Sequence, residues 1–232
     1  MIVDAELIEH LRAFDTPTIC NALEILVPER RGRGFTTRPF VAADPELPPI
    51  CGHARTATIR ARQPSHLPPE EAKARRLAYY EYIARPPHPT VAVIQDLDPE
   101  PGFGAFWGEV NSAIHKGLGC LGCITDGSIR DLDAIAPEFQ LLAGSVGPSH
   151  AFVHVEAFDL PVEVHGMPVR PGDLVHADRH GAVVIPEAAL PGLAEAIDLL
   201  VRRERHILNA ARSEDFSIER LRRVLAEAEE IH

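Results

Sequence analysis

The stretch from Trp107 to Asp131 reads WGEVNSAIHKGLGCLGCITDGSIRD. It holds an acidic residue after a glycine, a helix-like run, an apolar strand-like run and a turn at Asp126-Gly127. The turn brings Arg130 and Asp131 side by side after a predicted buried strand. An arginine there can bind a carboxylate or keto oxygen through two parallel hydrogen bonds, and an aspartate can hold a hard cation. The structural alternative is an Arg-Asp pair at a helix start, where the carboxylate favours the helix dipole.

The patterns on both sides of this stretch predict the class of fold. Apolar periodicity predicts helices at 4–13, 16–26, 68–85 and 109–116, and a helical segment from about 187 onward. Alternating or short apolar runs predict strands at 54–61, 90–94, 120–125, 152–155, 162–164, 174–177 and 182–185. Helices alternate with strands early and a β-meander comes late, which favours an α/β sandwich over a doubly wound sheet.

The composition excludes several classes of protein. The formal net charge of −11 argues against non-specific binding to nucleic acid or to an anionic membrane. No run approaches the ~20 apolar residues of a membrane span, and the N-terminal stretch lacks the order of a signal peptide. The four cysteines follow no disulfide-framework spacing. We therefore expect a cytoplasmic protein that binds neither nucleic acid nor membranes.

Two glycine and cysteine motifs have stronger structural than functional interpretations. Gly117–Gly122 satisfies GxGxxG, but it follows a helix and enters a strand, the reverse of the dinucleotide-binding order. A helix C-cap and a tight strand entry are the better interpretation. Cys120 and Cys123 form a CxxC inside an apolar run without a second ligand pair, so they are expected to behave as small apolar residues.

Two other features leave alternatives open. His150 and His154 stand four apart, so on a strand they share a face and could bind a metal, or be ordinary packed or surface histidines. Glu204 falls within the apolar stripe of the predicted C-terminal helix. A carboxylate in such a stripe needs a partner charge, a water network or a metal, unless it lies at a frayed edge.

The spacing of the charged residues resembles a known family. Glu109, twenty intervening residues and then Arg130-Asp131 resemble the acid-x20-Arg-Asp signature of the RraA-like proteins. This family includes the class II 4-hydroxy-4-methyl-2-oxoglutarate / 4-carboxy-4-hydroxy-2-oxoadipate aldolases and the regulator of ribonuclease E activity. The DGxxRD turn and the hairpin PGDLVHADRHGAVVIP at 171–186 extend the resemblance. The chain departs by Glu109, where Asp is commoner, and by a long charged segment at 62–89.

The resemblance implies an α/β/β sandwich of the swivelling-domain type, with C-terminal helices. It implies one RraA-like domain over 1–232, with a helical arm from about 187. It also implies assembly as a homotrimer or homohexamer with active sites between subunits. The implied substrate loop, whose amides open a helix and suit a carboxylate, comprises Gly108, Glu109, Val110 and Asn111.

The resemblance also implies a metal centre. Asp131 would bind Mg²⁺ or Mn²⁺ directly, and Glu109 would contact the metal through water. A glutamate on the C-terminal helix of a neighbouring subunit would hold further metal waters, and Glu204 is the candidate. Arg130 would bind the substrate carboxylate and the C2 keto oxygen. One carboxylate with waters and a chelating substrate suits Mg²⁺, which dehydrates reluctantly.

These roles imply a metal-dependent aldolase, a carbon–carbon lyase that cleaves a 4-hydroxy-2-oxo acid and releases pyruvate. The cation and Arg130 would stabilise the enolate in place of a Schiff-base lysine, for which Lys116 is a weak candidate. Decarboxylation of oxaloacetate would pass through the same enolate and is expected as a side activity. The rival from another class is a non-catalytic regulator that binds a ribonuclease.

Overall fold

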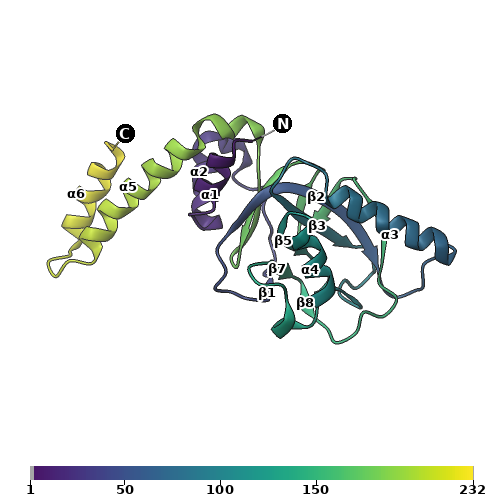
Figure 1. Ribbon diagram of the computed structural model, residues 1–232. Helices are drawn as coiled ribbons and strands as arrows, with labels where there is room; N and C mark the ends of the chain where they lie inside the picture. The colour runs from purple at the N-terminus through teal and green to yellow at the C-terminus, as the bar shows by residue number, and fades with distance from the viewer. Residues whose placement is uncertain (1–2, 232) are drawn as a thin grey trace. The chain divides into compact units, whose positions relative to one another are not determined.

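A computed structural model describes residues 3–231 of the chain. The chain divides into two compact units (Figure 1). The larger contains Arg33–Pro186 and the N-terminal residues through Thr16. The smaller contains Pro17–Gly32 and the chain from Glu187 onward. The candidate site lies in the larger unit.

The larger unit is built on a central mixed sheet in the order β1-β7-β5-β3-β2-β12-β13, and β9 also pairs with β2. The four middle strands are parallel, whereas β1, β9, β12 and β13 run antiparallel to their neighbours. The strands are β1 (Val41–Ala42), β2 (Ile50–Arg60), β3 (Thr90–Asp96), β5 (Cys120–Thr125), β7 (Gln140–Ala143), β9 (His154–Phe158), β12 (Leu174–Asp178) and β13 (Gly181–Ile185).

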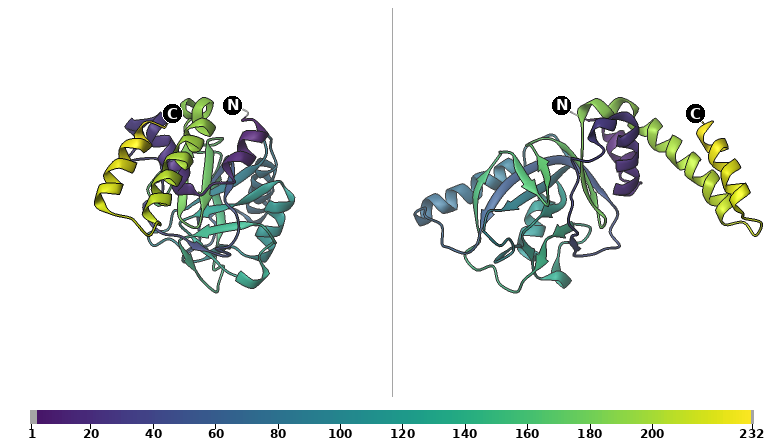
Figure 2. Two further views of the ribbon diagram at one scale, coloured as in Figure 1. Left: turned by 90° about the vertical axis from the view of Figure 1, so that its left-hand side faces the viewer. Right: turned by 180° about the vertical axis from the view of Figure 1, so that it is seen from behind.

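The sheet is buried on both faces. In β3, Val91 and Val93 join one apolar cluster, whereas Ala92 and Ile94 join another. Helices α3 (Pro69–Ile83) and α4 (Glu109–Gly117) flank the face of Ala92 and Ile94 (Figure 1). The hairpin of β10 (Val162–Val164) and β11 (Met167–Val169) packs on the other face. Figure 2 shows the ribbon from two further sides. This arrangement confirms the predicted α/β/β sandwich, in which the order is helices, sheet and hairpin.

A small parallel sheet contains residues from both ends of the stretch from Trp107 to Asp131. It consists of β4 (Ala105–Trp107), β6 (Ser128–Ile129) and β8 (Ser145–Val146). The sequence did not predict these strands because each has only two or three residues, too few for a periodic pattern.

The strand predicted at 152–155 begins later than expected. Ala151 has a left-handed backbone, with φ of 46°, and the Val153 amide donates to the His150 carbonyl at 2.9 Å. These residues therefore form a turn, and β9 begins at His154.

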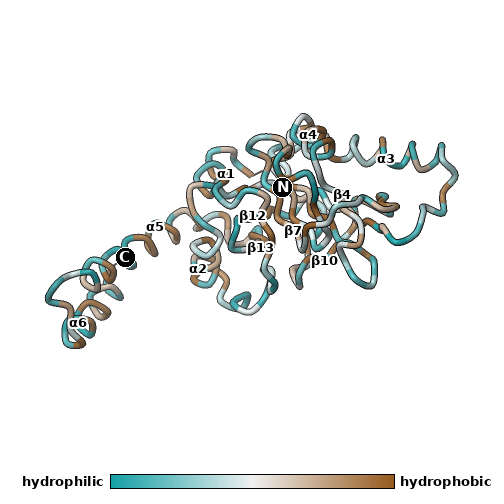
Figure 3. Tube along the Cα trace, turned by 90° about the horizontal axis from the view of Figure 1, so that it is seen from below, coloured by the Kyte–Doolittle hydropathy of each residue, from teal (hydrophilic) through white to brown (hydrophobic). Residues whose placement is uncertain are grey.

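The smaller unit contains residues 17–26 of α2 (Thr16–Leu26), together with α5 (Leu193–Ala211) and α6 (Ile218–Glu229). Apolar and polar residues alternate along α5 and α6 (Figure 3). The Arg203 Nε donates to the Ile231 carbonyl at 3.1 Å, and His206 Nε2 lies 2.9 Å from Glu227 Oε2. Helix α1 (Ala5–Leu11) belongs to the larger unit. Within 3–231, no helix has the length and apolar character needed to cross a membrane.

Candidate functional site

The site begins where β4 and β6 end side by side. The Arg130 amide donates to the Trp107 carbonyl at 2.9 Å, which places the residues after β6 beside Gly108. Gly108 caps α4, whose first turn starts at Glu109. The first N–H groups of a helix lack partners within the helix and carry its positive end charge. Arg130 and Asp131 thus meet the N-terminus of α4.

Asp131 is held against this helix start by its backbone and its side chain. Its backbone is left-handed, with φ of 55°. Its Oδ2 accepts a long hydrogen bond from the Glu109 amide at 3.4 Å and lies 3.6 Å from Arg130 Nε. Both side chains remain 36–37% exposed, so they can still reach a ligand. The carboxylate and the guanidinium are therefore oriented and accessible.

Gly108 makes room for the carboxylate. Its φ of −172° is extended and open to any residue, so conformational freedom does not require glycine here. Glycine is required by the lack of space, because a Cβ at this position would lie 2.5 Å from Asp131 Oδ2 and 3.2 Å from Arg130 Cγ. Glycine lets the helix start approach the Arg-Asp pair.

A cavity of about 730 Å³ opens in front of these groups. Five of the predicted site residues line it, namely Gly108, Val110, Asn111, Arg130 and Asp131. Glu109 is exposed and is not among the lining residues. The volume falls within the ~300–1,000 Å³ of small-molecule sites.

Glu204 lies in α5, in the smaller unit, and its side chain is exposed. A single chain therefore does not desolvate this carboxylate, and the argument from the apolar stripe does not apply within one protomer. Its contribution to a neighbouring subunit stays a prediction.

The side chains around the cavity match the ligand preferences of some divalent cations and not of others. Within residues 3–231, no three His, Cys, Asp or Glu side chains gather as a metal cluster. Asp131 is the one carboxylate among the residues that line the cavity. Zinc sites need three or four protein ligands, whereas Mg²⁺ keeps several waters and binds through one or two carboxylates plus substrate oxygens. The site therefore fits Mg²⁺, or Mn²⁺ with similar ligands, and does not fit zinc.

A buried polar cluster supports α4 from behind. His115 Nδ1 contacts the Asn111 carbonyl at 2.7 Å, and the Tyr79 hydroxyl contacts His115 Nε2 at 2.8 Å. Burial lowers the pKa of His115 to about 4, so the ring is neutral. The neutral ring can donate a hydrogen bond from Nδ1 to the Asn111 carbonyl and accept one from the Tyr79 hydroxyl at Nε2, so both ring nitrogens have a partner. This cluster fixes α4 relative to α3.

Helix α3 forms a wall of the cavity, which the sequence did not predict. The Tyr80 hydroxyl donates to Asn111 Oδ1 at 2.8 Å, and Asn111 Nδ2 donates to the Phe106 carbonyl at 2.5 Å. Tyr80 thereby orients a residue of the predicted substrate loop. The charged segment at 62–89, whose role the sequence left open, reaches the site through this helix.

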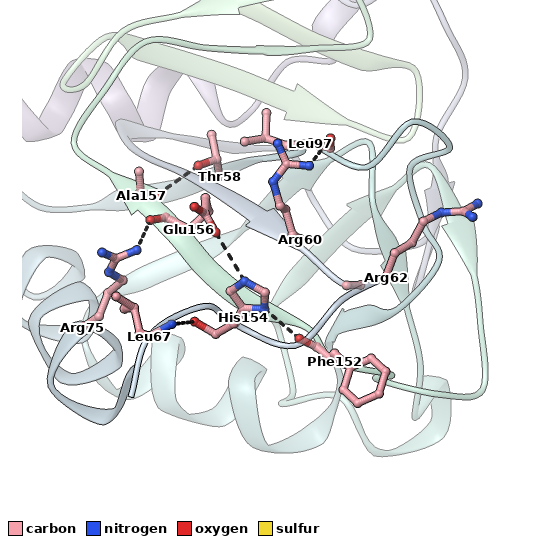
Figure 4. A network of polar contacts seen from close by, with 12 residues as sticks. Thr58, Arg60, Arg62, Leu67, Arg75, Leu97, Phe152, His154, Glu156 and Ala157 are labelled. Carbon is pink, nitrogen blue, oxygen red and sulfur yellow. Dashed lines mark hydrogen bonds and ion pairs between the residues drawn. The ribbon is translucent and has the colours of Figure 1, made fainter. Parts of the chain in front are cut away.

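A second contact network ties α3 to β9 (Figure 4). Arg75 Nη1 donates to the Glu156 carbonyl at 2.6 Å. The Glu156 side chain in turn lies 3.3 Å from His154 Nε2, and His154 Nδ1 contacts the Phe152 carbonyl at 2.8 Å. His150 and His154 both line the cavity, but His154 is engaged by Glu156.

The glycine and cysteine motifs are structural. Gly117 ends α4, Gly119 has φ of +86°, and Cys120 begins β5, which confirms the helix-end interpretation. Cys120 and Cys123 are buried free thiols. Burial raises the pKa of both, so they remain protonated and act as small apolar residues.

The sequence profile described as RraA-like, Aldolase/RraA, matches residues 16–184. The match covers well over half of the chain, and the protein therefore belongs to the RraA-like family.

Two relatives agree with this assignment. An uncharacterized protein of Methanocaldococcus jannaschii is 31% identical over 105 residues, which cover 44% of this chain and 50% of the relative. A protein of Halalkalibacterium halodurans, provisionally named a 4-hydroxy-4-methyl-2-oxoglutarate aldolase, is 33% identical over 85 residues. That alignment covers 36% of this chain and 40% of the relative. The chain thus matches half or less of the length of these curated relatives.

Solved structures agree on the fold. An uncharacterized protein of Pseudomonas syringae superimposes with a TM-score of 0.73 at 22% identity, covering 96% of this chain and 95% of that one. RraAS2 of Streptomyces coelicolor, described as an unusual member of the RNase ES inhibitor RraA protein family, superimposes with a TM-score of 0.68 at 24% identity. The superposition covers 92% of this chain and 99% of the RraAS2 chain. At these identities the likeness establishes the fold alone.

Proposed function

We propose that the protein is a divalent-metal-dependent aldolase that cleaves a 4-hydroxy-2-oxo acid and releases pyruvate. One observation carries the proposal: Arg130 and Asp131 lie together at the N-terminus of α4 and face a ligand-sized cavity. A cation, a carboxylate and free helix amides in one place suit an anionic substrate that also chelates a metal.

The chain's own residues bind and orient the substrate. The open amides of the α4 start and the Arg130 guanidinium bind the carboxylate of the 2-oxo acid, and Arg130 also donates to the C2 keto oxygen. Cleavage of the C3–C4 bond leaves its electron pair on the pyruvate fragment as an enolate, and the C4 hydroxyl becomes a carbonyl as its proton passes to water. The enolate then takes a proton from water at C3 and is released as pyruvate. Arg130 is placed to stabilise this developing negative charge. A Mg²⁺ or Mn²⁺ ion at Asp131 would supply Lewis-acid polarisation of the same oxygen.

The position of Lys116 argues against a Schiff base at this lysine. Its Nζ donates to the Pro137 carbonyl and lies 3.2 Å from Glu138 Oε2, and Lys116 does not line the cavity. Reactive lysines are desolvated or placed next to other cations, not paired with a carboxylate. We expect Lys116→Met to retain turnover, and borohydride added with pyruvate to leave the enzyme active.

The decisive assay measures pyruvate release from a panel of 4-hydroxy-2-oxo acids and oxaloacetate, with Mg²⁺ or Mn²⁺ and after EDTA. The proposal expects turnover that EDTA abolishes and added metal restores. Turnover that persists in EDTA would refute the metal route. No turnover of any 2-oxo acid, together with a stoichiometric ribonuclease complex, would replace the enzyme with a regulator that acts by binding.

We also propose that the protein assembles as a homotrimer or homohexamer in which Glu204 reaches the metal waters of a neighbouring subunit. The exposure of Glu204 on α5 leaves its carboxylate free for such a contact. Glu204→Gln should then weaken metal-dependent turnover without changing the mass measured by light scattering. An active monomer at assay concentration would refute the shared site.

A further inference from the structure

One face of α3 is turned toward the cavity. The helix residues that line it are Pro69, Ala72, Lys73, Arg76 and Tyr80, and Arg75 lines it as well. The first five recur at intervals of three and four residues, apart from the adjacent pair 72–73, and such spacing defines a single helix face. Lys73 and Arg76 therefore share the face that carries Tyr80.

The side chains that line the cavity carry more positive than negative charge. Among the described residues, four basic side chains line the cavity, Lys73, Arg75, Arg76 and Arg130, against the single carboxylate of Asp131. This excess stands out in a chain with a formal net charge of −11. A cation in a partly enclosed cavity attracts an anionic ligand more strongly than one on an open surface.

Two of the four cations have other partners. Arg75 donates to the Glu156 carbonyl, and Arg130 adjoins Asp131. In the described part of the chain, no ion pair involves Lys73 or Arg76. These two charges are therefore available to a ligand in the cavity.

The helix that carries them is fixed to the site. Tyr79, Tyr82 and Ile83 are buried in the core, and Tyr80 binds Asn111 in the predicted substrate loop. At about 1.5 Å of rise per residue, Arg76 lies one turn, roughly 6 Å, along the axis from Tyr80. The two cations therefore lie on the N-terminal side of Tyr80 along α3, on a cavity wall whose position is fixed by the core.

We propose that Lys73 and Arg76 form a second anion subsite, which binds a carboxylate on the end of the substrate remote from Arg130. The enzyme then selects 2-oxo acids with two anionic ends. This inference rests on the proposed function, which places the 2-oxo acid end at Arg130. The cavity of about 730 Å³ leaves room beyond a three-carbon pyruvate unit for such a substituent.

A binding experiment tests the subsite without turnover. Calorimetry in Mg²⁺ compares 2-oxoglutarate with 2-oxopentanoate, which have the same carbon skeleton length but two carboxylates and one. We expect the wild type to bind the dicarboxylate at least about tenfold more tightly, since one charged hydrogen bond is worth about that factor. The preference should shrink as salt is raised, because both cations are exposed.

The variants assign that preference to residues. Lys73→Met and Arg76→Met should each weaken 2-oxoglutarate binding by about tenfold and change 2-oxopentanoate binding less than twofold. Arg76→Lys, which keeps the charge, should recover part of the loss. Arg170→Met is the matched control, because Arg170 is an exposed cation of the same unit that does not line the cavity. Thermal midpoints of all variants should match the wild type.

Turnover separates this inference from the proposed function. With 4-hydroxy-2-oxoglutarate, the variants should raise KM and leave kcat nearly unchanged. Lys73 and Lys116 are the only lysines in the sequence, so borohydride trapping with pyruvate that is lost in Lys73→Met would make Lys73 a Schiff-base lysine and overturn the subsite.

The remaining outcomes distinguish failure of the subsite from failure of the aldolase. Turnover with no dependence of dicarboxylate affinity on Lys73 or Arg76 refutes the subsite and leaves the aldolase standing. Dicarboxylate binding that depends on both residues, without turnover of any 2-oxo acid, refutes the aldolase and leaves the subsite standing. Failure of the wild type to bind 2-oxoglutarate more tightly than 2-oxopentanoate refutes the subsite, and only the absence of turnover refutes the aldolase.

Discussion

The substitution Gly108→Ala tests whether the site depends on the close approach of the α4 start to Asp131. The new methyl group would lie 2.5 Å from Asp131 Oδ2, and real Cβ contacts essentially never fall below 3.0 Å. The carboxylate or the helix start must therefore move by at least about 0.5 Å, and by more to reach the ~3.5 Å of a relaxed contact. The backbone itself is not strained, because φ is −172°.

The displacement falls on the group that is proposed to hold the metal. Asp131 has a short side chain on a left-handed backbone, so rotation is its main route of escape. Rotation would break the contact with the Glu109 amide and change the distance to Arg130. A misplacement of ~1 Å at a reacting centre can reduce rate by ~10²-fold, and we expect kcat/KM to fall by about that factor. Stability should change by less than ~1 kcal/mol, because the Asp131 side chain is partly exposed.

Gly117→Ala is the matched control at the other end of the same helix. No atom lies within 4 Å of a Cβ there, and alanine in a helix is favoured over glycine by ~0.5–1 kcal/mol. We expect full activity and an equal or higher thermal midpoint. Steady-state pyruvate release and thermal unfolding are measured on both variants. A Gly108→Ala enzyme with wild-type kcat/KM would refute the importance of this contact, as would equal losses in both variants.

Two further predictions concern charge and pH. Asp131→Asn and Arg130→Met should each reduce kcat/KM by at least ~10²-fold with unchanged thermal midpoints, as measured by pyruvate release, because each removes a preorganised charge. Burial lowers the pKa of His115 and His176 from 6.5 to about 4. As the pH falls, the unfolded chain therefore takes up protons on these histidines that the native chain excludes, which lowers the free energy of unfolding. Burial raises the pKa of Asp126 to about 6, so this carboxyl takes up its proton first in the native chain and offsets the effect of about one histidine. These three groups should therefore contribute a net fall of ~3 kcal/mol in the free energy of unfolding between pH 7 and pH 4, as measured by urea titrations. The lowered pKa values of His53, His165 and Asp178 act in the same direction, whereas the raised pKa of Asp96 opposes it, and a constant free energy of unfolding would contradict this assignment.

The sequence predicted the layered fold because its long elements have clear periodicity. The strands at 90–94 and 120–125 and the hairpin around Asp178–Gly181 lie where their apolar runs placed them. The helix from Glu109 and its glycine-marked end were also found, since a helix C-terminus followed by a strand has a distinct local pattern. In these elements, local preference and tertiary packing agree.

The site residues predicted from the sequence that line the cavity all lie within one stretch of the chain, 108–131. Gly108 and the Arg130-Asp131 pair come from neighbouring strand ends, and the turn between them is visible in the sequence. The wall formed by α3 was not predicted, because nothing in the local pattern says which face of a charged helix meets a cavity. The contact of Tyr80 with Asn111 joins residues 31 apart, and only the fold brings them together.

The two ends of the cavity therefore have different structural origins. The Arg130-Asp131 end depends on short strands and on a glycine where a Cβ would crowd the Asp131 carboxylate, so changes there displace the groups proposed to act on the reacting carbons. The Lys73 and Arg76 end lies on the exposed face of a helix whose other side is anchored in the core. Substitutions on that face cost little stability and leave the Arg130 end in place. Because of this separation, we expect changes on α3 to alter which acid is bound while the reaction at Arg130 stays the same.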